Sequence, residues 1–263
     1  MEALNDGKHG SIPDTLNQTF HEVDRHLSQR AEDSDGKLHS GCTVVTSFLR
    51  LEDPKGGQSF LPKGHTVHSK TVYEPSSSDQ LRRVLYCANA GDARGVLCRG
   101  GKAVRLTYDH KGSDKQEAKR ITDAGGFMMS GRVNGVLAVT RSLGDSSMKE
   151  FVVGSPYTTE TELCDEDEFM ILACDGVSTY QFTVDVSFST YMLQLWDITS
   201  DQNAVKKVRA IADPHQASKF LVDYALRKGS QDNVTVLVIR FQHVPSDVKP
   251  SADEPSSDDA AES

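Results

Sequence analysis

The sequence predicts an α+β fold, in which short strands come in blocks and helices are grouped between them without strict alternation. Two apolar runs of strand length, residues 169–174 and 234–241, carry much of this prediction. The first run is continuously apolar, which indicates a strand buried on both faces. One segment with helical periodicity precedes the strands, and two more lie between the runs 169–174 and 234–241. Together these patterns favour a layered α+β arrangement over a doubly wound one.

Shorter strands are predicted where β-branched and apolar residues lie between turns that contain glycine. These segments are residues 43–49, 84–88, 95–98 and 133–140.

Three segments are predicted to be helical. Residues 14–29 carry Leu16, Phe20, Val23 and Leu27 along one face, which is the apolar stripe of an amphipathic helix. Two further helices are expected at residues 201–211, after the N-cap Ser200, and at residues 214–226, which begin with a proline.

The chain has 263 residues, which suits one large domain with a tail better than two domains. Residues 244–263 hold six acidic residues against Lys249, and this composition predicts a disordered acidic tail. We therefore expect one domain over residues 1–243 and a tail over residues 244–263.

Composition also excludes several classes of protein. The longest apolar runs are far shorter than a membrane span, and the first residues lack the pattern of a signal peptide, so we expect no membrane partner. The net charge of -9 disfavours nucleic-acid binding. Five cysteines without a CxxC pair favour a reducing, intracellular location, cytoplasmic or nuclear.

Two carboxylates have unusual positions along the chain. Asp175 directly follows the buried strand 169–174, and Asp232 comes just before the strand 234–241. A third, Asp92, lies in a turn between two predicted strands. Carboxylates held at the ends of rigid strands can converge on Mg²⁺ or Mn²⁺, which prefer oxygen ligands. Taken singly, the spacing of each favours a turn residue that binds backbone amides.

Six motifs occur in a fixed order around these carboxylates. They are residues 90–94 (Ala-Gly-Asp-Ala-Arg), 106–111 (Leu-Thr-Tyr-Asp-His-Lys), 132–135 (Arg-Val-Asn-Gly), 137–145 (Leu-Ala-Val-Thr-Arg-Ser-Leu-Gly-Asp), 173–176 (Ala-Cys-Asp-Gly) and 231–236 (Gln-Asp-Asn-Val-Thr-Val). Together they closely resemble the metal-dependent serine/threonine protein phosphatases of the PPM family, type 2C, with a likeness to its small fungal members.

The resemblance implies a four-layer α-β-β-α sandwich with two antiparallel sheets and a site for two Mn or Mg ions. It implies that Asp175 binds both metals, that Asp232 binds the second, and that Asp92 binds a weaker third. No catalytic residue beyond these metal ligands is assigned. The implied substrates are phosphoserine and phosphothreonine in phosphorylated proteins, hydrolysed by a monomer.

The sequence departs from the family pattern in two places. The family's Asp-Gly-His-Gly segment is not found, and residues 6–10 only mimic it, so we expect an N-terminally incomplete domain with impaired activity. Residues 177–194 separate Asp175 from the family's Leu-Trp-Asp sequence, and we interpret them as an insertion, either a retained intron or a surface loop. A catalytically inactive, phosphatase-like binding module is the alternative function.

Overall fold

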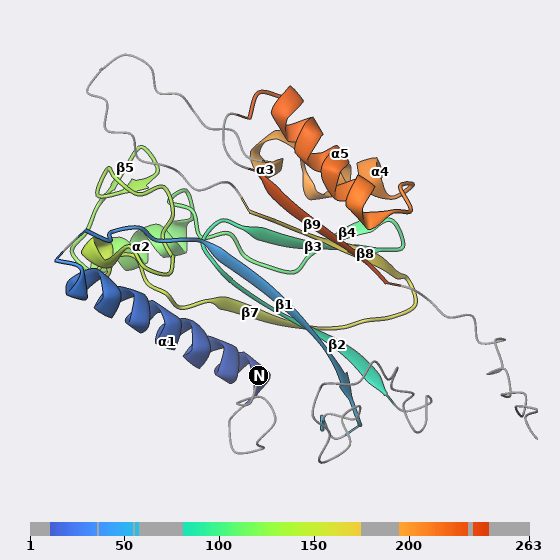
Figure 1. The fold of residues 1–263 in the computed structure, drawn as a ribbon, viewed down its shortest axis with the longest axis horizontal. Helices are drawn as coiled ribbons and strands as arrows, with labels where there is room; N and C mark the ends of the chain where they lie inside the picture. The colour runs from blue at the N-terminus through green and yellow to red at the C-terminus, as the bar shows by residue number, and fades with distance from the viewer. Residues whose placement is uncertain are drawn as a thin grey trace, which may run out of the picture.

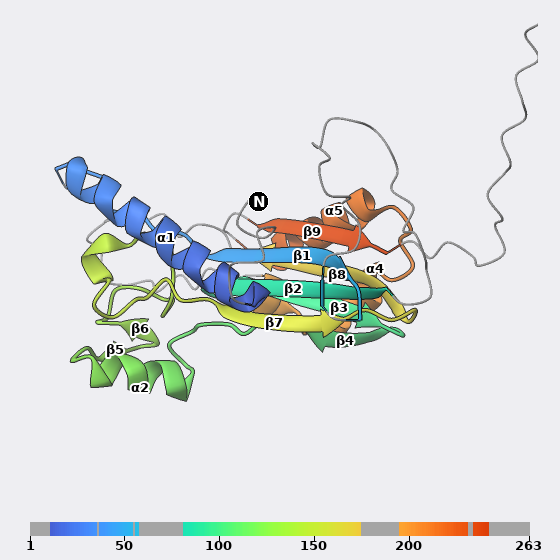
Figure 2. The same ribbon diagram turned by 90° about the horizontal axis from the view of Figure 1, so that it is seen from below.

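Two antiparallel sheets face each other, with helices on both outer sides, so that the elements form four layers (Figure 1 and Figure 2). This computed structural model describes residues 11–35, 37–54, 56–57, 81–174, 195–230 and 234–241. The acidic tail, the segment 177–194, Asp175 and Asp232 lie outside the described residues.

The first sheet has the strand order β1-β2-β7. Its strands are β1 (Val44–Glu52), β2 (Arg82–Ala90) and β7 (Tyr157–Glu162). β2 is the central strand, with Val44 opposite Ala90 on one side and Glu162 opposite Val84 on the other.

The second sheet has the order β4-β3-β8-β9. Its strands are β3 (Arg94–Arg99), β4 (Lys102–Arg105), β8 (Asp167–Cys174) and β9 (Thr235–Arg240). A separate small hairpin is formed by β5 (Met128–Met129) and β6 (Arg132–Val133).

Helix α1 covers the first sheet, and helices α4 and α5 cover the second (Figure 1). The helices are α1 (Ile12–Asp33), α2 (Lys115–Asp123), α3 (Leu195–Ile198), α4 (Asp201–Val208) and α5 (Pro214–Arg227). A short 3₁₀ helix, η3, spans Ser146–Met148. α1 begins with a capping box in which Ser11 and Asp14 bond each other's backbone amides, which satisfies donors that the first turn leaves free.

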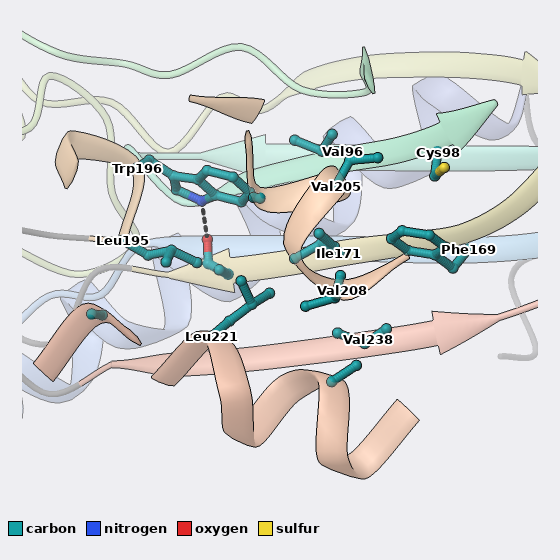
Figure 3. Close-up of a cluster of buried hydrophobic side chains, with 14 residues drawn as sticks. Val96, Cys98, Phe169, Ile171, Leu195, Trp196, Val205, Val208, Leu221 and Val238 are labelled. Carbon is teal, nitrogen blue, oxygen red and sulfur yellow. Dashed lines mark hydrogen bonds between the residues drawn. The ribbon is translucent and has the colours of Figure 1, made fainter. Parts of the chain in front are cut away.

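Alternation along β8 explains why the layers pack as they do. Phe169, Ile171 and Ala173 point toward α3, α4 and α5, where they join the cluster drawn in Figure 3. Met170 and Leu172 point the other way, into the core between the two sheets. A strand that is apolar on both faces must be covered on both faces, and this accounts for its continuous apolar sequence.

β2 alternates in the same way on the other side of the molecule. Leu85 and Cys87 face the second sheet, while Ala88 and Ala90 pack against Phe20 of α1. The predicted four-layer α-β-β-α sandwich is therefore confirmed, with its central core between the two sheets.

Two details of the sequence prediction are wrong. Residues 133–140 do not form a strand: β6 ends at Val133, because Asn134 and Gly135 have positive φ angles of 50° and 73° that reverse the chain. Val23 does not join the buried stripe of α1 but is 42% exposed. The other predicted strands and helices are confirmed within a few residues.

None of the helices in the described ranges combines the length and apolar character that crossing a bilayer requires.

Replacing Leu221 by alanine should test the packing of α5 on the second sheet. The Leu221 side chain is fully buried, so Leu221→Ala is expected to lower the free energy of unfolding by about 2–5 kcal/mol. Leu226→Ala, on the same helix but 50% exposed, should change it by much less. Urea denaturation of both variants makes the comparison, and equal losses would contradict this packing.

Candidate metal centre

The ends of three neighbouring strands, β3, β8 and β9, lie side by side at one end of the second sheet. Arg94 at the start of β3 pairs with Ala173, and Cys174 at the end of β8 pairs with Thr235 at the start of β9. Because β8 is antiparallel to both neighbours, its last residues lie beside the first residues of each. The described residues at these three strand ends therefore lie side by side.

Asp92 lies at this end of the sheet. It lies in the turn 91–93 between β2 and β3 and is 3% exposed. Buried carboxylates are rare in proteins unless charged or hydrogen-bonding partners compensate them. We refer to the turn 91–93, Cys174 and Thr235 together as the Asp92 end of the sheet.

The other two predicted ligands adjoin this end along the chain. Asp175 directly follows Cys174, and Asp232 precedes Thr235 by three positions. Both lie outside the described residues, so their roles as ligands stay predictions.

The described residues supply part of what a hard cation needs. Carboxylate oxygens suit Mg²⁺ and Mn²⁺, and Asp92 offers one carboxylate in a buried setting. Within the described ranges, however, there is no group of three Asp, Glu, His or Cys side chains that could hold a metal. The fit of a two-metal site therefore depends on Asp175 and Asp232.

A network of buried ion pairs stabilises the Asp92 end. The Nε of Arg94 donates to both carboxylate oxygens of Asp109, at 3.0 and 3.1 Å, and its Nη1 donates to Asp201 at 2.7 Å. Arg105 donates to the other oxygen of Asp201 at 2.8 Å. Burial by itself would lower the pKa of Arg94, but Asp109 and Asp201 outweigh burial and raise it. The guanidinium therefore stays charged and links β3 to the start of α4.

Helix α3 also lies at this end. The indole Nε1 of Trp196 donates to the carbonyl oxygen of Ala173 at 3.2 Å, as the dashed line in Figure 3 shows. The Arg94 guanidinium carbon lies 5.0 Å from the centre of the Trp196 ring, within range of a cation–π contact. Trp196, 7% exposed, is thus a core residue.

A second buried cluster surrounds Glu117 of α2. Arg141 donates to both of its carboxylate oxygens, at 2.6 and 3.0 Å, and the Thr140 hydroxyl donates at 2.9 Å. Burial alone would raise the pKa of Glu117, but Arg141, Thr140 and Arg120 overcome this and lower it to about 2. Arg141 therefore holds the loop after β6 onto α2, which supports a structural role for this residue.

The ion-pair partners of Arg94 were not predicted from the sequence. Asp109 and Asp201 are 15 and 107 positions away along the chain, and nothing in their local sequence indicates pairing. The available signal was a charged residue at the first position of a buried strand, since such a charge needs a partner. Lys111 and Asp197, which pair at 3.0 Å, were missed for the same reason.

The fold is that of known phosphatases. The structure is similar to a C. elegans sex determining protein with a TM-score of 0.63 at 22% identity, covering 90% of this chain and 49% of that one. It is also similar to a phosphatase from Toxoplasma gondii, with a TM-score of 0.59 at 21% identity, covering 92% and 80%. At identities this low, the similarity to these two structures concerns the fold alone.

Sequence similarity goes further. The family model for protein phosphatase 2C matches residues 3–182. Protein phosphatase 2C homolog 1 of Schizosaccharomyces pombe is 40% identical over 241 residues, covering 91% of this chain and 56% of that protein. Protein phosphatase 2C homolog 1 of Saccharomyces cerevisiae is 42% identical over 228 residues, covering 87% and 68%.

The chain belongs to the protein phosphatase 2C family. It spans little more than half the length of the Schizosaccharomyces pombe relative.

The Glu117 cluster predicts a specific dependence of stability on pH. Because the pKa of Glu117 is lowered from 4.5 to about 2 in the folded protein, its contribution is fully present above pH 4.5 and is lost as the pH falls toward 2. At 1.36 kcal/mol per pKa unit, the loss should be about 3 kcal/mol.

Urea denaturation of the unmodified chain and of Glu117→Gln between pH 2 and pH 7 checks this prediction. The difference between the two free energies of unfolding should shrink below pH 4.5. Glu150→Gln, which changes an exposed carboxylate, should show no such trend. A difference that stays constant with pH would show that Glu117 is not held ionised by Arg141.

Proposed function

We propose that the protein hydrolyses phosphoserine and phosphothreonine in proteins, using Mn²⁺ or Mg²⁺ bound at the Asp92 end of the second sheet. The observation that carries this proposal is the strand register, which brings the ends of β3, β8 and β9 together beside a buried carboxylate. Membership of the protein phosphatase 2C family supports the reaction type.

Each predicted ligand has its own part. Asp175 would bind two ions, Asp232 one of them, and Asp92 a third, weaker ion. When bound, such ions supply hydroxide near neutral pH and neutralise the charge of a phosphoryl group under attack. The described chain contributes rigidity, because ion pairs and strand pairing fix the strand ends that adjoin these carboxylates along the chain.

Reduced activity is part of the proposal. The 263 residues contain no Asp-Gly-His-Gly sequence, which the family resemblance assigns to a bridging carboxylate. The second candidate function, a phosphatase-like module that binds phosphorylated proteins without hydrolysing them, is favoured by the same absence. A monomeric state, a location inside the cell and the lack of a nucleic-acid partner stay predictions.

Residues 177–194 are proposed to be an insertion that the fold does not need. The described residues on either side already meet, since Trp196 bonds to Ala173 and Leu195 is fully buried in the same core cluster. Joining Gly176 directly to Leu195 would shorten the chain between two described segments that are already in contact.

Hydrolysis of a phosphothreonine peptide tests the proposed reaction. Turnover should require Mn²⁺, and Asp175→Asn should reduce it by about 100-fold or more, since loss of an outer partner of a metal ligand alone costs about 10–100-fold. Asp165→Asn, which changes an exposed carboxylate far from the Asp92 end, should leave turnover unchanged.

Three results would decide against parts of this proposal. Full turnover in Asp175→Asn would show that the Asp175 carboxylate is not needed for hydrolysis. A folded, unmodified chain that binds the peptide without hydrolysing it would favour the inactive module. Turnover equal to that of the Saccharomyces cerevisiae relative would contradict reduced activity.

Deletion of residues 177–194 tests the insertion. The free energy of unfolding should stay the same or rise by up to about 2 kcal/mol, because closing a shorter loop costs less entropy. A variant with a Gly-Ser linker of equal length separates the effect of length from that of sequence. Unfolding of the deletion variant would show that these residues are part of the fold.

A further inference from the structure

The backbone directly before Asp92 is held on both sides. The carbonyl oxygen of Gly91 accepts the backbone N–H of His110 at 2.8 Å and the side-chain amide of Asn89 at 2.9 Å. The same Asn89 amide also donates to the carbonyl oxygen of Tyr108 at 2.8 Å. Two segments of chain, the turn 91–93 and the loop around His110, are thus tied together at one peptide group.

The imidazole of His110 makes a third link. Its ring is fully buried, and its Nδ1 lies 3.2 Å from the Gly91 nitrogen and 3.1 Å from the Gly91 oxygen. A carbonyl oxygen has two lone pairs, and the two donors named above already use them. Nδ1 therefore accepts the Gly91 N–H, and the proton of the neutral ring is on Nε2.

This assignment leaves a buried polar atom without a partner. Among the described residues, no acceptor lies within hydrogen-bonding distance of Nε2. Burial, followed by the charge of Arg141, lowers the pKa of His110 to about 4, so the ring stays neutral near pH 7. An unpaired buried N–H is unfavourable, and a smaller apolar residue would avoid it. The link to Gly91 gives a reason for a histidine here.

Gly91 leaves the turn little freedom. Its φ angle is +112°, and a Cβ atom built there would lie 2.4 Å from the Cγ2 of Thr43. Only glycine can follow this path so close to β1. The backbone between β2 and Asp92 is therefore fixed by sterics on one side and by His110 on the other.

We propose that His110 is a positioning residue, which accepts the Gly91 N–H through Nδ1 and so fixes the direction in which the Asp92 carboxylate extends. This proposal rests on the proposed function, in which Asp92 is a metal ligand. His110 also reaches away from the site, because its carbonyl oxygen accepts the Thr140 N–H at 3.0 Å. It thereby joins the Asp92 turn to the cluster around Glu117.

Two amide variants of matched polarity provide the test. In His110→Asn the side-chain oxygen can take the place of Nδ1 and accept the Gly91 N–H. In His110→Gln one more methylene group moves that oxygen out of place. Val208→Ala, a core change in α4 away from the Asp92 end, controls for loss of stability. Asp92→Asn removes the ligand charge itself.

Calorimetric titration of each folded protein with Mn²⁺ alone is the readout, without any turnover. His110→Gln should weaken binding by about 10-fold or more, as loss of an outer partner does at other metal sites, while His110→Asn should bind like the unmodified chain. Val208→Ala should melt at a lower temperature with unchanged binding. In the Asp92→Asn background, His110→Gln should cause no further loss, because both changes act through one carboxylate.

The outcomes separate this proposal from the one it rests on. If Asp92→Asn weakens Mn²⁺ binding but His110→Gln does not, Asp92 is a ligand and His110 does not position it. If Asp92→Asn has no effect, or the unmodified chain binds no Mn²⁺, the ligand role of Asp92 and the positioning role of His110 both fail. If His110→Gln does not fold, weakened binding in the folded His110→Asn variant would likewise overturn the proposal.

Discussion

Strand β8 is hydrogen-bonded to a neighbour on each edge and buried on each face, and this double constraint fixes the positions of most other elements. Pairing with β3 and β9 sets the register of three strands at once. A slip of one residue would exchange the residues that face the helices with those that face the first sheet. Since both sets are apolar and fill different cores, the register is set by packing on both sides. That register also determines which residues lie side by side at the Asp92 end.

At this end of the sheet the charge of Arg94 is compatible with burial because two carboxylates pair with it. Arg94 meets Asp109 and Asp201, and Lys111 meets Asp197. These pairs join the start of β3 to the loop after β4 and to helices α3 and α4. Buried pairs add little net stability, but removal of one partner leaves an uncompensated charge and is strongly destabilising. Their effect is to make the arrangement at the Asp92 end specific.

The sequence allowed prediction of the elements that carry a clear apolar pattern. β8 and β9 stand out as apolar runs, and α1 and α5 as amphipathic helices. Helix α2 was not predicted, because few of its side chains are apolar and its buried residues include the charged Glu117, whose partner Arg141 lies 24 positions away. β7 was missed because its Thr and Glu residues alternate without large apolar side chains.

The candidate site was predictable only in part. Its carboxylates could be named from strand ends and from ordered motifs, but the contacts that hold them depend on tertiary structure. The hydrogen bond from Gly91 to His110 joins residues that are 19 positions apart in the sequence. Arg94 and Asp201, which form an ion pair, are 107 positions apart. The residues next to each of these positions in the sequence do not indicate a contact with a partner so far along the chain. Asp92 is placed by the structure, whereas the ligand roles of Asp175 and Asp232 stay predictions.

Paramagnetic broadening by Mn²⁺ in a ¹H–¹⁵N NMR spectrum tests most directly whether the metal binds where these strand ends meet. We expect the amide signals of Ala93, Cys174 and Thr235 to broaden first, because these residues belong to the Asp92 end. Signals of Gly100 and Glu166, which are joined by a hydrogen bond at the opposite end of the sheet, should stay sharp. Broadening that begins at Gly100 and Glu166, or that spreads evenly over both ends, would contradict the account.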